Sequence, residues 1–332
     1  MRRTVARIGV VAALALSMGV AAVNAPSARA EEPGLVSAAR ANNDEMNYAI
    51  NLAGTNPEDL QRALALVPGA GGAALASYPE IGTFFAQSAT PSFAPDLAAA
   101  LRQAGISIHS IGPTRVAPVL YYERVELPTD KKDEAPAPQS GAAGGLNSMR
   151  DETASAAPAE ANEEIFNWGA VAMHAREAEA VNVKRAPVTV AVVDSGVEDT
   201  HPDLEGRVDT SRSVKCSVNG VATQDFYGWR DEFYHGTHVA GIIAANHNDI
   251  GIDGIAPEST IVAIQATNDN RLIYPEYVTC AFMWAASHGV DVVNNSYSMD
   301  PWVYWSPTDP EQAAGLEAAT RSIKYAQDKG LA

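Results

Sequence analysis

The stretch 234–241 (YHGTHVAG) places histidines among small residues at the start of an apolar helix that is predicted to run to about Ala245. Each glycine inside a helix costs about 1 kcal/mol relative to alanine, so Gly236 and Gly241 predict close packing of this helix against a sheet. His235 lies at the predicted helix start, where a cleft can reach it. An imidazole in that place suits general acid–base catalysis.

A run of β-branched residues, 188–193 (VTVAVV), ends directly before Asp194. Such a run predicts a strand that is buried on both faces, as in a parallel sheet, and Ser195 with Gly196 predicts the turn that ends it. Asp194 therefore lies at the carboxyl-terminal edge of the sheet, where the sites of open α/β sheets form. A carboxylate beside a buried strand needs a partner to offset its desolvation, and a histidine is the obvious candidate.

The rest of the C-terminal half alternates strands with helices. After the helix at His235, the pattern predicts strands at 260–266 and 290–296 and helices at 275–288 and 311–329. This alternation favours an α/β fold with a right-handed, doubly wound parallel sheet over residues 165–332.

Three motifs in this region resemble those of the subtilisin-like serine proteases: DSG at 194–196 with THPDL at 200–204, HGTHVAG at 235–241, and GIAP at 254–257. Asp before His before Ser is the order of that family's catalytic triad. The resemblance implies that His235 is the general base for a serine hydroxyl, that Asp194 orients its imidazole, and that His238 is a structural neighbour. We therefore expect a serine endopeptidase that hydrolyses peptide bonds through an acyl-enzyme.

The resemblance stops before the third member of the triad. The family's Gly-Thr-Ser-x-Ala-x-Pro string, which carries the nucleophile, and the Gly-Asn strand end, which supplies the oxyanion asparagine, do not occur in these 332 residues. We expect residues 165–332 to be the N-terminal part of a peptidase domain, incomplete at its C-terminus and inactive alone, because losing a triad nucleophile costs about a millionfold in turnover. The alternative is a non-catalytic truncated subtilase that acts as a peptide-binding or inhibitory protein.

The segment 291–297 (DVVNNSY) resembles the family's strand and substrate-binding segment. The resemblance makes Asn294, Ser296 and Tyr297 candidate contacts for an extended polypeptide that binds by strand addition. A plain strand end, in which Asn and Ser side chains cap backbone groups, explains the same residues.

Two metal sites are conceivable from the sequence, although the expected chemistry requires no cofactor. The segment 248–252 (NDIGI) resembles the family's structural calcium loop, with Asp203 and Asn248 as candidate ligands; an ordinary acidic turn explains it equally well. His235 and His238 also share a helix face, as zinc ligands do. Zinc-protease helices carry His-Glu-x-x-His, however, and Gly236 cannot replace the general-base glutamate.

Residues 31–126 predict a separate small α+β domain. Strands are expected at 47–52, 73–81, 83–86 and 106–111, and helices at 57–66 and 91–104. The order β-α-β-β-α-β predicts a ferredoxin-like sandwich. Its position resembles that of a subtilase propeptide, which assists folding and blocks the cleft of the zymogen until it is cut away; an unrelated small domain is the alternative.

Targeting and processing segments flank this domain. Arg2, Arg3 and Arg7 precede an apolar run that ends before ARA at 28–30, which predicts a signal peptide over residues 1–30, an extracellular protein and no stable membrane anchor. Residues 127–164 contain no aromatic side chain, are rich in Pro, Ala, Gly and Ser and carry net negative charge. They predict a disordered acidic linker in which processing occurs.

The charge and cysteine content of the chain limit which binding partners and which disulfides are expected. The formal net charge of −17 would repel phosphate backbones, so the expected partners are a polypeptide substrate and the chain's own propeptide rather than nucleic acid. The two cysteines, Cys216 and Cys280, are compatible with one disulfide in an exported protein and equally with two buried thiols, since the sequence does not give their separation.

Overall fold

The computed structural model describes residues 45–115, 168–181, 188–225 and 227–332. The predicted signal segment 1–30 and linker 127–164 lie outside these residues, as does the end of the predicted first domain, 116–126. The described residues contain two sheets, one in 46–113 and one in 189–294.

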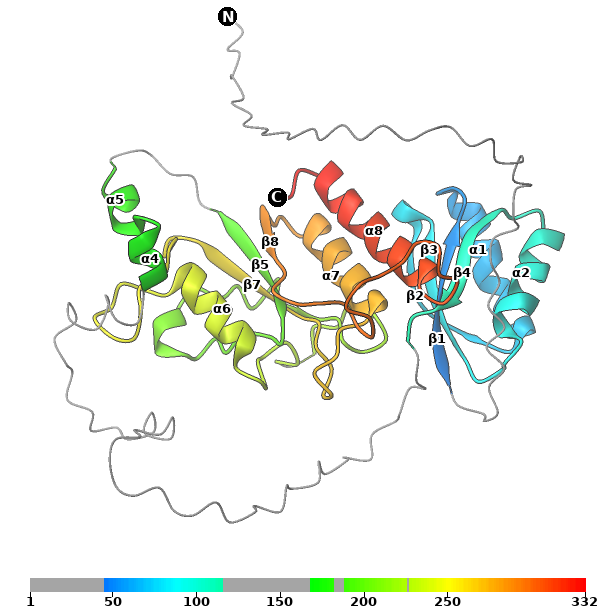
Figure 1. Cartoon of the computed structure of the whole chain (residues 1–332), viewed down its shortest axis with the longest axis horizontal. Helices are drawn as coiled ribbons and strands as arrows, with labels where there is room; N and C mark the ends of the chain where they lie inside the picture. Colours follow the sequence, from blue (N-terminus) through cyan, green and yellow to red (C-terminus); the bar gives the residue numbers. More distant parts are fainter. Residues whose placement is uncertain (1–44, 116–167, 182–187, 226) are drawn as a thin grey trace, which may run out of the picture. The chain divides into compact units, whose positions relative to one another are not determined.

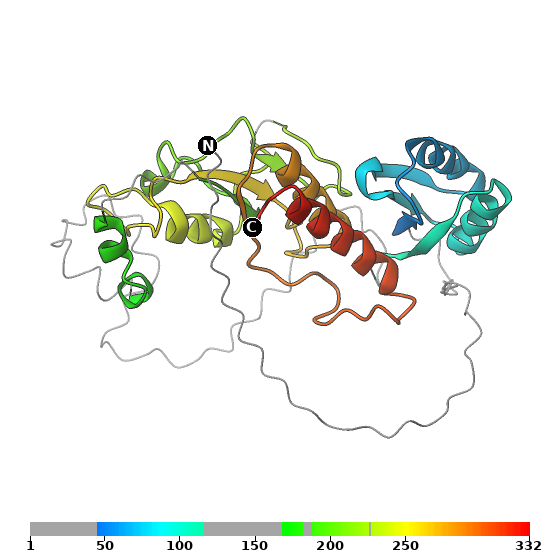
Figure 2. The ribbon, with the colours of Figure 1, turned by 90° about the horizontal axis from the view of Figure 1, so that it is seen from above.

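The first folded region, residues 45–115, contains a four-stranded antiparallel sheet in the order β2-β3-β1-β4. Its elements are β1 (Met46–Leu52), α1 (Pro57–Leu66), β2 (Ala73–Tyr78), β3 (Thr83–Ser88), α2 (Phe93–Gln103) and β4 (Ile108–Pro113). Both helices pack on the same face of the sheet (Figures 1 and 2), where Leu60 of α1 and Phe93, Leu97 and Leu101 of α2 form one buried core with β1. This is the expected β-α-β-β-α-β order.

Several strand boundaries in this region differ from the prediction: β1 starts one residue earlier, and β3 and β4 each end two residues later, at Ser88 and Pro113. The second strand ends at Tyr78 because 79–81 form a 3₁₀ turn that closes at Gly82, whose φ is +61°. The last strand starts at Ile108 and not at Ile106, because the Ile106 N–H donates to the carbonyl of Leu101 and terminates α2.

The second folded region, residues 188–332, is built on a parallel sheet in the order β6-β7-β5-β8. Its elements are β5 (Thr189–Asp194), β6 (Val214–Lys215), α6 (His235–Ala244), β7 (Thr260–Gln265), α7 (Pro275–Ser287), β8 (Val292–Asn294) and α8 (Ala313–Asp328). The strand predicted at 290–296 is only Val292–Asn294, because three residues pair with β5. Short helices α4 (Trp168–Ala172) and α5 (Ala175–Ala180) precede this region.

Helices cover both faces of the parallel sheet, as expected for a doubly wound fold. In β5, Val190 and Val192 pack with α6, whereas Ala191 and Val193 point to the opposite core, which α7 covers. Helix α8 lies beside α7 (Figure 1). The continuous apolar run of β5 is thus explained by burial on both sides.

Cys216 and Cys280 form a disulfide, which resolves the alternative that the sequence left open. The bridge joins the segment after β6 to α7 across 64 residues of chain. Closing a loop of that length stabilises the folded state by about 4 kcal/mol through the entropy of the unfolded chain.

Within the described part of the chain, no helix is both long enough and apolar enough to cross a membrane.

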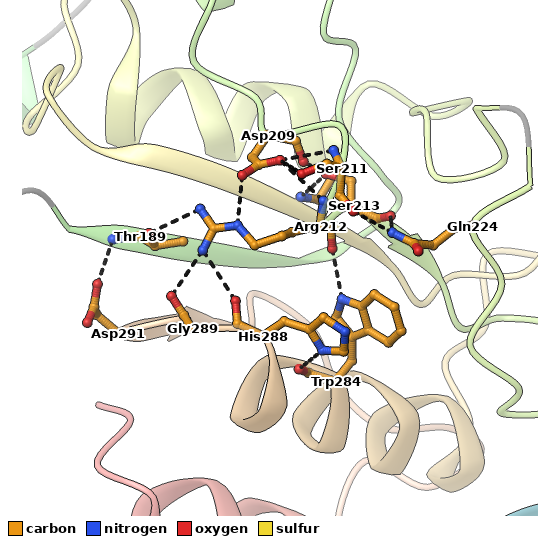
Figure 3. A network of polar contacts seen from close by, with 11 residues as sticks. Thr189, Asp209, Ser211, Arg212, Ser213, Gln224, Trp284, His288, Gly289 and Asp291 are labelled. Carbon is orange, nitrogen blue, oxygen red and sulfur yellow. Dashed lines mark hydrogen bonds and ion pairs between the residues drawn. The ribbon is translucent and has the colours of Figure 1, made fainter.

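Arg212 ties together the elements at the amino-terminal edge of the parallel sheet (Figure 3). Its Nε donates to Asp209 Oδ2 at 2.7 Å, and its Nη1 donates to the carbonyl oxygens of His288 and Gly289 at 3.2 and 3.1 Å. The Arg212 carbonyl in turn accepts from Trp284 Nε1 at 2.8 Å. Since carbonyls at a helix C-terminus lack intrahelical partners, the guanidinium caps the end of α7.

Arg212→Met should lower the free energy of unfolding by about 1–3 kcal/mol, because two carbonyls and Asp209 Oδ2 lose the guanidinium as a donor. Urea denaturation measures this change. The control is Lys324→Met, which removes an exposed ion pair with Asp328 and should cost less than about 1 kcal/mol. Equal losses for the two variants would contradict the capping role of Arg212.

Candidate active site

The structure brings Asp194 and His235 together from positions 41 residues apart in the chain. Asp194 is the last residue of β5 and His235 is the first residue of α6, and His235 Nδ1 lies 2.7 Å from Asp194 Oδ1. The side chain of Asp194 is 5% exposed and that of His235 is 60% exposed. A buried carboxylate on Nδ1 favours the tautomer that carries its proton there, which leaves Nε2 to accept a proton.

The two oxygens of Asp194 differ in their hydrogen bonds. Asp194 Oδ1 also accepts from the N–H of Ser195 at 2.7 Å, whereas Oδ2 is buried and has no hydrogen-bond partner among the described residues. Burial and, secondarily, the negative charge of Asp194 raise the pKa of Tyr297, so its phenol stays protonated. The structure therefore brings Tyr297 to the same end of the sheet as Asp194.

Asp231 organises the loop that leads into α6, a role that the sequence analysis missed. Its Oδ1 accepts from Ser195 Oγ at 2.8 Å and from the N–H of Tyr234 at 2.9 Å, and its Oδ2 accepts from the N–H and the hydroxyl of Thr237 at 2.8 and 2.6 Å. The N–H of Phe233 donates to the same carboxylate. An aspartate just before a helix is a capping signal, and that signal could have identified Asp231.

Ser195 and Gly236 lock the start of α6 onto the end of β5. Ser195 Oγ, which donates to Asp231, accepts from the N–H of Gly236 at 2.9 Å. A Cβ atom on Gly236 would overlap the carbonyl oxygen of Gly196, so the predicted close packing is confirmed at this glycine. At Gly241 the prediction is wrong: the nearest atom to an added Cβ is Ile252 Cδ1 at 3.9 Å, because that turn of α6 faces a loop with room for a methyl group.

The candidate substrate-binding residues lie at the end of β8. Asn294 pairs with Val192 as the last residue of the strand, which places Ser296 and Tyr297 beyond the paired part, near Asp194. Ser296 is exposed, and its hydroxyl donates to Asn294 Oδ1 at 3.0 Å. This bond is of the strand-end type, and binding of a peptide by these residues stays a prediction.

The two candidate calcium ligands come from different segments and both bond to the turn at 248–252. Asp203 is 6% exposed and its Oδ2 accepts from the N–H of Ile252 at 3.2 Å, while Asn248 Oδ1 accepts from the N–H of Ile250 at 3.3 Å. Both side chains thus close the turn at 248–252, and each oxygen retains a lone pair that could serve a hard cation.

The zinc alternative finds no support in the described part of the chain, where no group of three or more His, Cys, Asp and Glu side chains is arranged to hold a metal ion. His238 is exposed on α6. His238, which the sequence analysis predicted to be a structural neighbour of His235, therefore lies at the protein surface and not in the core.

Residues 185–331 match the model of the Subtilase family. Fervidolysin from Fervidobacterium pennivorans is 37% identical over 144 residues, which are 41% of this chain and 20% of that protein. Subtilisin from Bacillus pumilus is 36% identical over 127 residues, which are 38% of this chain and 41% of that protein. The chain thus matches less than half of the length of these relatives.

One solved structure shows the same fold over a larger part of the chain. The epidermin leader peptide processing serine protease from Staphylococcus aureus superposes with a TM-score of 0.53 and 19% sequence identity, over 87% of this chain and 58% of that chain. Coverage of that extent necessarily reaches into residues 45–115. At this identity the likeness concerns the fold alone.

Gly236→Ala and Gly241→Ala should have opposite effects on stability although both glycines lie in α6. Gly236→Ala should destabilise the fold, because its methyl group collides with the Gly196 backbone. Gly241→Ala should stabilise it by up to about 1 kcal/mol through helix propensity. Thermal unfolding of the two variants beside the parent checks the sign of each change, and a stabilising Gly236→Ala would contradict the packing described above.

Asp231→Ala should release His235 from Asp194, because the donors around the start of α6 lose their common acceptor. We expect the downfield proton signal of a histidine Nδ1–H bonded to a carboxylate to be present in the parent and lost or broadened in this variant. Glu232→Ala removes an exposed neighbouring carboxylate and is the matched control, with the signal retained. An unchanged signal in Asp231→Ala would show that Asp231 does not position the pair.

Proposed function

We propose that residues 185–331, which match the model of the Subtilase family, belong to that family, and that the chain carries the acid and the base of a secreted serine endopeptidase. The observation that carries the proposal is the 2.7 Å contact between the exposed His235 and the buried Asp194. In peptide hydrolysis, His235 takes the proton of a serine hydroxyl and returns it to the leaving amine. Asp194 holds the tautomer and stabilises the imidazolium that forms.

The proposal assigns two members of the triad to this chain and leaves the serine outside the 332 residues, which contain no Gly-Thr-Ser-x-Ala string. The nearby serines support this assignment. Ser195 Oγ is bonded to Asp231 and to the Gly236 N–H, and Ser296 Oγ is bonded to Asn294. Neither hydroxyl is set up to be activated by His235.

We propose an extended polypeptide as the substrate. The pairing of β8 with β5 stops at Asn294, so the backbone of Ser296 and Tyr297 continues along the edge that holds Asp194 without a partner strand in the β5–β8 ladder. Backbone groups in such a place can pair with an added strand, which gives affinity without selecting side chains.

We propose that the first folded region is the chain's own propeptide, which acts as an inhibitor and a folding partner. Its sheet contacts α8: Asn51 Nδ2 donates to the carbonyl of Ala314 at 2.9 Å. Arg321 of α8 donates to the carbonyls of Leu52 and Ile81 at 2.8 and 3.0 Å. These contacts give the region a docking surface on the peptidase part, as an intramolecular inhibitor requires.

Secretion and a structural calcium ion complete the proposal. The Cys216–Cys280 disulfide supports an oxidising, extracellular environment. The buried Asp203 carboxylate beside the turn at 248–252 supports a calcium site that would stabilise this loop without taking part in the chemistry.

The test compares two products. The 332-residue chain should hydrolyse a denatured protein no faster than its own His235→Ala variant. The product of the native gene, with its length determined by intact mass, should hydrolyse it and lose about a millionfold in kcat on His235→Ala, as expected for a triad member. His238→Ala, an exposed histidine on the same helix, is the matched control and should retain activity.

Two outcomes would contradict the proposal. Hydrolysis by the purified 332-residue chain that disappears in His235→Ala would place the nucleophile within these residues. An inactive native product whose reading frame ends at Ala332 would favour the peptide-binding or inhibitory alternative.

A further inference from the structure

A buried carboxylate at the start of α7 receives its partners from the first folded region. Glu276, the second residue of α7, has an exposed fraction of 0%. Its Oε1 accepts from Asn47 Nδ2 at 2.8 Å and forms an ion pair with Arg115 Nη2. Burying a carboxylate is strongly unfavourable unless it is paired, so the second folded region carries a charge that only the first one neutralises in the described structure.

Arg115 is held on more than one side. Its side chain is 5% exposed, and its guanidinium stacks on the ring of Tyr274, the residue that precedes α7, with 4.0 Å between Cζ and the ring centroid. A planar guanidinium can pair with a carboxylate and stack on an aromatic ring at once, which an ammonium group cannot match. The place is therefore specific for arginine.

The Cys216–Cys280 disulfide lies next to the site where Glu276 and Arg115 pair. Cys280 lies one helical turn after Glu276, and its bridge to Cys216 fixes the loop 217–221 against α7. In that loop, the Gly220 carbonyl accepts from Tyr78 Oη at 2.7 Å. Gly220 has a φ of +68°, and a Cβ there would lie 2.6 Å from the Glu276 carbonyl oxygen, which shows how tightly the loop packs on α7.

We name this place the Glu276 socket: Glu276, Tyr274 and the loop 217–221. The polar contacts in it are incomplete, because Asn47 Oδ1, Arg115 Nε and Glu276 Oε2 are buried without a hydrogen-bond partner among the described residues. A buried pair with unmet hydrogen bonds adds little net stability, yet losing one member leaves an unpaired charge at a cost that a correct partner avoids. Such a pair acts on the selection of a partner more than on its affinity.

One part of the interface, between the first sheet and α8, is apolar. Ala49 and Phe85 of the first sheet pack on Ala314 and Ala318 of α8 in one small apolar cluster. Small apolar side chains supply burial but discriminate weakly between partners of similar shape.

We propose that the Glu276 socket is the recognition site for the first folded region, that the Arg115–Glu276 pair selects this partner, and that the Cys216–Cys280 disulfide keeps the socket in shape. The inference rests on the proposed function only in that it treats the first folded region as a propeptide. It concerns binding and not inhibition, so it is tested without any substrate.

The test uses the whole folded chain with a specific protease site inserted between residues 127 and 164. After cleavage there, size-exclusion chromatography over a dilution series gives the dissociation constant of the two pieces. Arg115→Met and Glu276→Met should each weaken association by roughly 100-fold or more, because each leaves a buried charge unpaired. The double variant has no buried charge and should return to within about tenfold of the parent.

A second arginine in the interface provides the matched control. Arg321→Met removes two hydrogen bonds to the first folded region and an ion pair with Glu317 of α8, which is 28% exposed. It leaves no fully buried charge, so the loss of association should be about tenfold. Single variants that bind like the parent, or a double variant as weak as the single ones, would overturn the role of the pair. If a single variant fails to fold, the double variant and Glu276→Gln carry the same comparison.

The disulfide is tested by replacing both cysteines with alanine. The expected result is weaker association of the cleaved pieces, with amide hydrogen exchange in β1 and β5 unchanged from the parent. Unchanged association would overturn the role of the disulfide in the socket. Loss of protection in β5 would show that the bridge serves the fold of the second region and would equally count against that role.

Discussion

The buried Asp194 carboxylate is the constraint on which the candidate active site depends. A carboxylate at the end of a strand that is buried on both faces is stable as an anion only if it is well partnered. Its partners are the Ser195 N–H and His235 Nδ1, each 2.7 Å from the same oxygen. His235 is the exposed member of the pair. The buried Asp194 carboxylate therefore affects groups outside the protein only through the tautomer and orientation of this imidazole.

Holding that imidazole in place needs several backbone devices. The Asp231 carboxylate gathers the N–H groups that open α6, and Ser195 links this carboxylate to the Gly236 N–H. Gly236 allows the helix to approach the turn after β5 more closely than any side chain would permit. Hydrogen bonds and the absence of a Cβ atom at Gly236 thus position the start of α6 relative to the end of β5. This positioning does not depend on the contact between His235 and Asp194.

The Glu276 socket applies the same physical rule at another place. Glu276 is also a buried carboxylate, but its partners come from residues 45–115 and not from its own sheet. A charge of this kind stabilises the folded chain little, yet it makes the wrong partner costly. The disulfide at Cys280, one turn further along α7, holds the loop that completes the socket. The candidate active site and the contact between the two folded regions therefore each depend on a buried carboxylate, Asp194 or Glu276, that needs a partner.

What the sequence determined is local. The run before Asp194 and the small residues after His235 define a strand end and a helix start, and the spacing of apolar residues in 46–113 defines the β-α-β-β-α-β order, because periodicity acts over neighbouring residues. The tertiary structure decided what depends on distance in space: the Cys216–Cys280 bridge, the capping role of Asp231, and the pairing of Arg115 with Glu276, 161 residues away. No local pattern encodes these contacts, since each depends on how separate elements pack.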